Sequence, residues 1–307
     1  MKVKYTSRER RDGLGYQMVN LTSLVFFAEK FDLNVICDLR DFPYFQSCPT
    51  YSDTDASRLL EFHPRIIHNI DHISSIPKEE IFDWREYGYD HSLACLATGW
   101  ANQGHPFVVD FAGFTKLHHV CNKMPIRIKD QGVIDKYKER VQGSITVHAR
   151  LGNGEPCNGL SAEAYYKRIG VTQEQFISEM DKYSEDFFVC TDTFEFYKKC
   201  KDVFGDRVFS ARNNWSPEGC GAGHNIHSKK YSEAARRKWD AAGINPWDVF
   251  CESLIDMELL REGKHIICNK SAFSMFARKF LTKTVLRDKQ GQKEAIWENP
   301  WRSKFWA

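Results

Sequence analysis

A short run at residues 145–155 joins a strand-like segment to side chains that can bind an anion. Residues 145–147 are apolar or β-branched, and His148, Arg150 and a polar, glycine-containing segment follow them. In open α/β sheets, ligands bind at the carboxyl ends of the strands. A guanidinium group can hold two phosphate oxygens at once because its N–H donors form a planar fork. The run therefore predicts an anion site at Arg150, although a strand ending in an ordinary turn with a salt bridge has the same pattern.

The overall composition describes an ordinary globular protein. The chain has 307 residues, a length that suits two domains of roughly 150 residues each. Its 43 basic and 41 acidic residues give a net charge of +2, which offers no reason to expect binding to nucleic acid. No apolar run is long enough for a membrane span and the N-terminus lacks a secretory signal, so we expect a cytoplasmic protein. None of the ten cysteines forms a C-x-x-C pair, which argues against a zinc ribbon or thioredoxin-type site.

The first half of the chain begins with a β-α-β pattern. The expected elements are a strand at 3–5, a glycine-containing turn at 11–15, a helix over 18–28 and a strand at 33–38. This unit is similar to the start of a dinucleotide-binding fold, which suits a nicotinamide-dependent oxidoreductase, but it lacks the third glycine of that fingerprint. Residues 42–104 show few clean periods and predict irregular structure, with a further strand at 106–110.

The second half alternates strands and helices more regularly. We expect strands at 144–149, 187–192, 207–210 and 264–268, and helices at 130–142, within 161–183, at 194–204, at 247–260 and from 271 to 280. A polar, glycine-containing loop with a charged helix inside it fills 211–245. This alternation predicts a doubly wound parallel sheet.

Several segments of the chain match the motifs of one enzyme family in the right order. They are HARLGNGE (148–155), FVCTDTFEFYKKC (188–200) and SLIDMELLREGKHIICNKSAFSMFARKF (253–280), with GLGYQ (13–17) and ENPW (298–301) near the two ends. Together they resemble the α-1,6-fucosyltransferase family, and within it most of all the branch that fucosylates chitin oligosaccharides.

The resemblance implies a fold and a division into domains. The fold is α/β and GT-B-like, with two Rossmann-type domains facing a central cleft. We place an acceptor-side domain at 1–142, a GDP-sugar-binding domain at 143–284 and a tail at 285–307 that packs back on the first domain.

The resemblance also implies a reaction. Members of the family transfer fucose from GDP-fucose with inversion and need neither metal nor cofactor. The segment at Asp192 agrees with this, since Asp192 is followed by Thr193 and Phe194 and so forms no Asp-x-Asp pair there. The implied acceptor is O6 of N-acetylglucosamine in an oligosaccharide. A polysaccharide acceptor, another nucleotide sugar, or a non-catalytic relative that binds a glycan or nucleotide stays open.

The first motif carries the expected catalytic residues. Arg150 would contact the departing β-phosphate of GDP. His148 lies on the same strand face, where it touches the donor or orients Arg150. Many relatives carry a basic residue and then an aspartate after the arginine; here Leu151 and Asn153 take those places. Asn153 can contact the donor but cannot act as a base, so Glu155 is the candidate base, with a solvated loop acid as the other interpretation.

Two aspartates complete the charged part of the expected donor site. Asp192 ends a strand, where it accepts hydrogen bonds from guanine or ribose, or caps the following helix. Asp256 lies in a helix among apolar residues, a costly place for an unpaired carboxylate. We expect it either to recognise guanine or to orient Arg150.

The remaining candidates lie in loops and at helix starts. Arg212 and His227 belong to the loop that closes over the donor in this family. The segment Ser271, Ala272, Phe273 and Ser274 opens a helix whose N–H groups suit a diphosphate, although Ser271 can also be a plain cap. The other candidates, from GLGYQ, are Gly13, Gly15 and Gln17.

Overall fold

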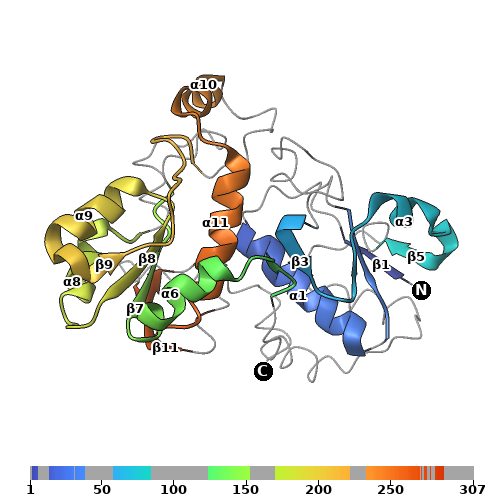
Figure 1. The fold of residues 1–307 in the computed structure, drawn as a ribbon, viewed down its shortest axis with the longest axis horizontal. Coiled ribbons are helices and arrows are strands. Elements are labelled where there is room, and N and C mark those ends of the chain that lie inside the picture. Colours follow the sequence, from blue (N-terminus) through green and yellow to red (C-terminus); the bar gives the residue numbers. More distant parts are fainter. Residues whose placement is uncertain are drawn as a thin grey trace.

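The computed structural model shows two parallel sheets on opposite sides of the molecule (Figure 1). The residues described are 2–5, 14–30, 32–38, 58–83, 124–152, 170–221, 233–269, 271, 273–274, 277 and 281–286. The fold is α/β, as predicted. None of the helices in this described part is long and apolar enough to cross a membrane.

The first sheet has four parallel strands in the order β4-β2-β1-β5. Its elements are β1 (Lys2–Tyr5), α1 (Leu14–Lys30), β2 (Val35–Cys37), β4 (Ile66–Ile67), α3 (Ile70–Ser75), the 3-10 helix η3 (Lys78–Glu80) and β5 (Ile81–Asp83). The helix α1 buries Met18, Leu21 and Val25, whose spacing places them on one helical face. The expected β-α-β unit is thus confirmed, but α1 begins earlier than predicted and takes Gly15 into its first turn.

The prediction of irregular structure was wrong for residues 58–83, where short strands and helices form. One of them, β3 (Leu60–Phe62), pairs antiparallel with β6 (Ile126–Ile128), and α6 (Gly132–Gln142) follows β6. These strands have two or three residues each, so their pairing depends on partners far away in the sequence. The strand expected at 106–110 lies outside the described residues.

The second sheet has five parallel strands in the order β11-β10-β7-β8-β9. Its strands are β7 (Ile145–Ala149), β8 (Phe187–Thr191), β9 (Val208–Phe209), β10 (His265–Asn269) and β11 (Thr282–Leu286). The helices are α8 (Gln173–Met180), α9 (Phe194–Phe204), the 3-10 helix η6 (Gly205–Arg207), α10 (Glu233–Ala242) and α11 (Pro246–Leu259). The predicted doubly wound pattern is confirmed, and β11 adds an edge strand that was not predicted.

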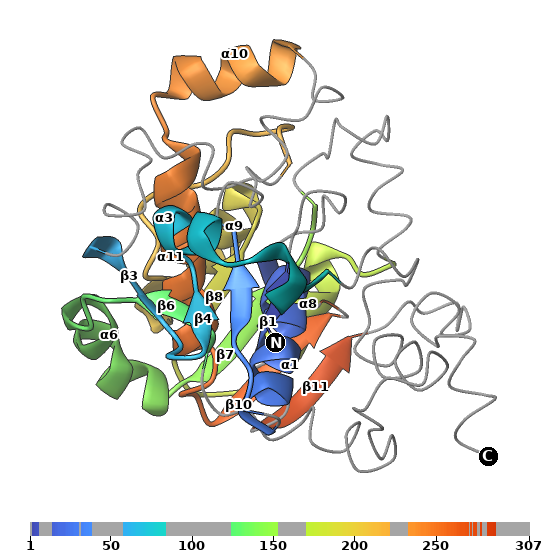
Figure 2. The same cartoon turned by 90° about the vertical axis from the view of Figure 1, so that its right-hand side faces the viewer.

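Side chains of the central strands alternate between two buried clusters. Phe187 and Val189 of β8 pack with α8 and α9 on one face, while Phe188 and Cys190 pack on the face covered by α11. Because both faces are buried, the strand reads as a continuous apolar run. The helix α10 stands beyond the end of α11, away from both sheets (Figures 1 and 2), and buries Trp239 against Val249 of α11.

The order of the strands fixes where a ligand crevice would lie. The chain starts the second sheet at β7, moves outward through β8 and β9, and then returns to β10 on the other side of β7. The direction of winding therefore changes between β7 and β10. Ligands of such sheets bind outside the carboxyl ends of the strands at this switch point.

Candidate functional site

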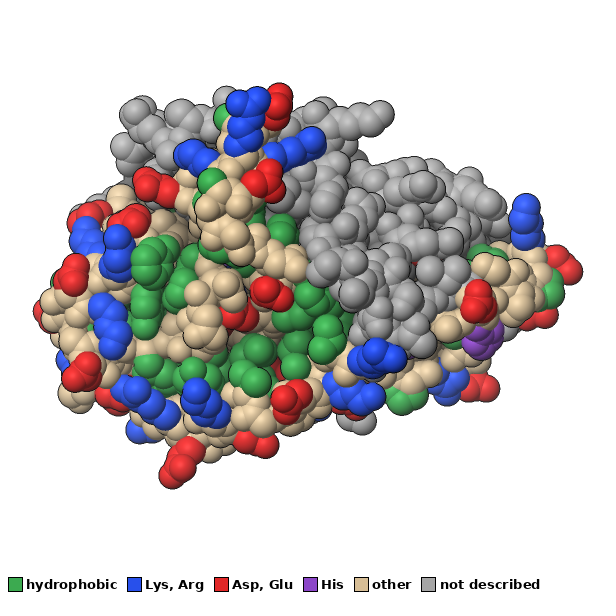
Figure 3. All heavy atoms as spheres, turned by 45° about the horizontal axis from the view of Figure 1, so that its top comes forward, with side chains coloured by type: hydrophobic (Ala, Val, Ile, Leu, Met, Phe, Trp, Pro, Cys, Tyr) green, Lys and Arg blue, Asp and Glu red, His purple; other side chains and the backbone are tan. Residues whose placement is uncertain are grey.

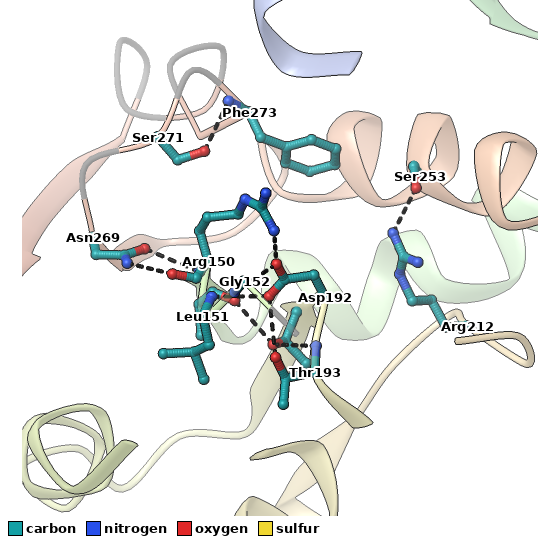
Figure 4. A network of polar contacts seen from close by, with 12 residues as sticks. Arg150, Leu151, Gly152, Asp192, Thr193, Arg212, Ser253, Asn269, Ser271 and Phe273 are labelled. Carbon is teal, nitrogen blue, oxygen red and sulfur yellow. Dashed lines mark hydrogen bonds and ion pairs between the residues drawn. The ribbon is translucent and has the colours of Figure 1, made fainter. Parts of the chain in front are cut away.

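Polar residues from three neighbouring strands meet at the carboxyl edge of the second sheet (Figure 4). Arg150 directly follows β7, Asp192 directly follows β8, and Asn269 is the last residue of β10. Carboxyl ends of adjacent parallel strands lie at one edge, so the fold brings these residues together. Arg150 and Asn269 flank the switch point between β7 and β10, and Asp192 lies on the other side of β7.

Asp192 holds both the side chain of Arg150 and the loop that carries it. The Arg150 guanidinium forms an ion pair with Oδ2 of Asp192. The two oxygens of the same carboxylate accept hydrogen bonds from the N–H groups of Leu151 and Gly152, each at 2.9 Å. Gly152 has a φ of 93°, a value that favours glycine. In this structure Asp192 thus organises the loop after β7, while Thr193 takes the N-cap position of α9.

Asn269 was not among the residues singled out from the sequence. Its Oδ1 accepts from the Arg150 N–H at 3.0 Å, and its Nδ2 donates to the Arg150 carbonyl at 2.7 Å. The residue is 1% exposed. A polar residue ending an apolar strand was the signal that selected Asp192, and the same signal at 265–269 could have selected Asn269.

His148 and Phe273 bring two aromatic rings to the same edge. The rings stack with centroids 4.9 Å apart and an angle of 11° between their planes. His148 is almost fully buried, so the stack covers one face of its imidazole. Below Phe273, Ser271 Oγ accepts from the Phe273 N–H at 3.1 Å and Ser274 Oγ donates to the Ser271 carbonyl at 3.1 Å. Ser271 Oγ thus bonds the N–H two residues ahead, as serine does in turns, and its expected roles as a helix cap and in a diphosphate site stay predictions.

A second, buried charge pair lies beside this edge, between the loop after β9 and α11. Arg212 Nε contacts Asp256 Oδ2, and Arg212 Nη2 donates to Ser253 Oγ at 2.7 Å. Asp256 is 0% exposed. Burial raises the pKa of its carboxyl group and the charge of Arg212 opposes that rise. Asp256 was expected to recognise guanine or to orient Arg150. In the structure Asp256 pairs with Arg212 while Arg150 pairs with Asp192, and guanine recognition stays a prediction.

The loop that begins at Arg212 is fixed further by the same helix. Glu252 of α11 accepts hydrogen bonds from the N–H of Asn213 at 3.2 Å and from the N–H and Nδ2 of Asn214, both at 2.9 Å. The start of the loop at 212–214 is therefore held by three acidic or hydroxyl side chains of α11: the adjacent Glu252 and Ser253, and Asp256 about one turn further on. Closing over a donor, the function expected of the loop that contains Arg212 and His227, stays a prediction.

Some expected site residues are placed elsewhere or fall outside the description. Gly15 and Gln17 lie in α1, where both are buried. Among the described residues, no group of three or more His, Cys, Asp and Glu side chains could hold a metal ion. Five of the expected site residues, Gly13, Asn153, Glu155, His227 and Ala272, lie outside the described ranges.

The cationic side chain of Arg150 is fixed at the carboxyl edge of the second sheet, the edge at which such sheets bind ligands. Arg150 is 23% exposed and its partner Asp192 is 16% exposed, so the pair is only partly shielded from solvent. Stable placement of a guanidinium at the carboxyl edge of a doubly wound sheet suits a phosphate or diphosphate group.

Comparisons with known proteins give similarity in structure only. No protein-family model and no curated protein matches the chain. Crystal structures of NodZ alpha-1,6-fucosyltransferase, one soaked with GDP-fucose and one co-crystallised with GDP, share 18% identical residues at TM-scores of 0.46 and 0.47. Each aligns over 91% of this chain and 92% of its own. A selenomethionine NodZ structure from Bradyrhizobium shares 16% at a TM-score of 0.49, over 91% of both chains.

Proposed function

We propose that this protein is a glycosyltransferase that moves fucose from GDP-fucose to a sugar hydroxyl. The observation that carries the proposal is the placement of Arg150, the first residue beyond the strand at the switch point, held by Asp192 and lying in the segment that resembles the first family motif. A fixed, partly exposed guanidinium at this edge matches the diphosphate of a nucleotide sugar. The proposed acceptor is O6 of N-acetylglucosamine in an oligosaccharide.

The proposal includes a GT-B-like arrangement of two Rossmann-type domains facing a central cleft. The strand orders support it. In each parallel sheet the chain begins at a central strand, β1 in the first sheet and β7 in the second, adds strands on one side, and then returns to the other side. The acceptor-side domain would comprise 1–142, and the donor domain would begin at 143. Since β11 runs to Leu286, we extend the donor domain from 284 to that residue, and the tail follows it.

The proposed reaction is a single inverting displacement. The acceptor hydroxyl attacks C1 of fucose, the bond from C1 to the β-phosphate oxygen breaks, and its electron pair leaves with GDP. Arg150 stabilises the negative charge that grows on the phosphate in an oxocarbenium-like transition state. The proton of the acceptor goes to a carboxylate, for which we propose Glu155. The guanidinium supplies the positive charge at the leaving group, so the mechanism needs no metal.

One observation favours a second candidate function. Leu151, at the position where many relatives carry a basic residue, is fully buried in the apolar cluster beneath the loop. A contact that those relatives make to phosphate or acceptor is therefore lacking at this position. The same fold could then use another nucleotide sugar or a polysaccharide acceptor, or bind its ligand without catalysis.

The proposal is tested by nucleotide release from a panel of nucleotide sugars, with a metal chelator present and with or without chitin oligosaccharides. We expect release of GDP from GDP-fucose, stimulated by the oligosaccharide and abolished in Arg150→Ala. The matched control is Arg140→Ala, which breaks the ion pair with Asp186 at the opposite end of the same sheet and should leave turnover unchanged. Release from a different donor would support the second candidate, and GDP binding without turnover would support the non-catalytic form.

A further inference from the structure

We infer that Asn269 is a positioning residue for Arg150 and that both polar atoms of its side chain are required. This inference rests on the proposed function of Arg150. Asn269 ends β10, the strand next to β7, and its amide bonds the N–H of Arg150 at 3.0 Å and the carbonyl of Arg150 at 2.7 Å (Figure 4). The two bonds cross the switch point between β7 and β10.

The chemistry of this pair is specific for an amide. The parallel pairing of β10 with β7 ends at Cys268 and His148, so the main chain of β10 offers no further paired residue for Arg150. The Asn269 side chain bonds Arg150 instead: its oxygen accepts from the Arg150 N–H and its nitrogen donates to the Arg150 carbonyl. A carboxylate of the same shape could accept but not donate. Because Asn269 is buried, replacing its amide by a carboxylate would leave the Arg150 carbonyl without its donor. The protein would lose stability, and Arg150 would lose its fixed position.

The consequence for Arg150 is that it is held at two points. Asn269 fixes the main chain, which sets the direction in which the side chain leaves the strand, and Asp192 fixes the guanidinium from the other neighbouring strand. A cation fixed in this way stabilises charge on a leaving group without first having to reorganise. Loss of Asn269 leaves Arg150 charged but displaced, so it should act on the chemical step more than on donor binding.

The test uses Asn269→Asp, which keeps the shape and the acceptor but removes the donor, and Asn269→Ala, which removes both bonds and adds no charge. For each we expect kcat for GDP-fucose to fall roughly 10- to 100-fold with a much smaller change in KM, as for a displaced catalytic group. The matched control is Asn245→Asp. Asn245 caps α11 and only accepts a hydrogen bond, from the Trp247 N–H at 2.9 Å, so aspartate should replace it with no loss of activity.

A second readout tests positioning without any nucleotide. The NMR signal of the Arg150 Nε–Hε group, identified by its loss in Arg150→Lys, should shift or broaden in both Asn269 variants and stay in place in Asn245→Asp. An unchanged signal together with kcat within twofold of the wild type would overturn the inference. The inference would also be overturned if kcat fell only in proportion to a lower Tm while the Arg150 NMR signal stayed in place. If the wild type shows no turnover, the proposed function fails, and the NMR signal alone decides the role of Asn269.

Discussion

At the scale of single residues, Asp192 combines a charge interaction with the support of a loop. Its two oxygens contact the Arg150 guanidinium and the N–H groups of Leu151 and Gly152. In Asp192→Asn one carboxylate oxygen becomes an NH2 group. That group cannot accept a hydrogen bond, and it would face the N–H of Leu151 or Gly152. We expect kcat to fall and the free energy of unfolding to drop by about 1–3 kcal/mol, the cost of losing charge-assisted hydrogen bonds.

Urea unfolding and GDP release measure these two effects of Asp192→Asn separately. Asp186→Asn is the matched control, because Asp186 pairs with Arg140 on the surface and such pairs contribute about 0–1 kcal/mol. Equal losses of stability in the two variants, with full activity in both, would show that Asp192 does not organise the loop.

His265 makes the stability of the second sheet depend on pH. Its Nδ1 lies 2.8 Å from Thr282 Oγ1 and its Nε2 lies 3.0 Å from Thr284 Oγ1, so it links β10 to the edge strand β11. Burial lowers its pKa below the ordinary value of 6.5, and the charge of Glu179 opposes this. The folded protein therefore favours the neutral imidazole, and the stability it provides is present above pH 6.5 and is lost as pH falls through the lower folded pKa.

The pH dependence is measured by urea unfolding between about pH 7.5 and about pH 5. The wild type should lose more stability on acidification than His265→Asn, which cannot titrate. Parallel curves for the two proteins would contradict the assignment to His265.

At the scale of elements, the turn between α11 and β10 lies tightly against β7. A Cβ atom on Gly263 would lie 2.5 Å from Thr146 Cγ2 and 3.2 Å from the Ser144 carbonyl oxygen. We expect Gly263→Ala to lower the free energy of unfolding by about 1–3 kcal/mol, as overpacking does. Gly143→Ala is the control, since its Cβ would meet only the Arg140 carbonyl oxygen at 3.5 Å and its φ is −81°. Chemical denaturation of both variants should separate them clearly, and equal stabilities would show that the turn can move aside.

The elements differ in how far the sequence could predict them. The strands β7 and β8 are buried on both faces. The apolar run of β8 and the apolar or β-branched start of β7 therefore indicate them from the sequence. The strand β11 has Thr282 and Lys283 exposed and lies at an edge, so its sequence carries neither an apolar run nor a clear alternation. The site divides in the same way: Arg150 and Asp192 follow recognisable strands, whereas the pairing of Asp256 with Arg212 depends on tertiary packing that spacing does not encode.

At the scale of the whole molecule, the two sheets share one buried apolar cluster. It includes α1 beside the first sheet, β6 between the sheets, and α11 together with strands of the second. An ion pair adds to this connection, because Arg127 of β6 contacts Glu258 of α11 at 2.5 Å. Burial raises the pKa of Glu258 and Arg127 opposes that rise. A continuous core predicts that the halves of the chain unfold together, even though each has its own sheet.

This prediction is tested by heating the wild type and following far-ultraviolet circular dichroism and tryptophan fluorescence. We expect the two signals to change in one coincident transition. Met18→Ala in α1 and Leu254→Ala in α11 both remove fully buried side chains of the shared cluster, and each should cost about 2–5 kcal/mol. Both variants should therefore lower the same Tm for both signals. Two transitions, with Met18→Ala moving one and Leu254→Ala moving the other, would show that the sheets belong to independently folding units. A ligand at the carboxyl edge of the second sheet would then stabilise only one of them, whereas in a single cooperative unit GDP should raise the Tm of the whole chain.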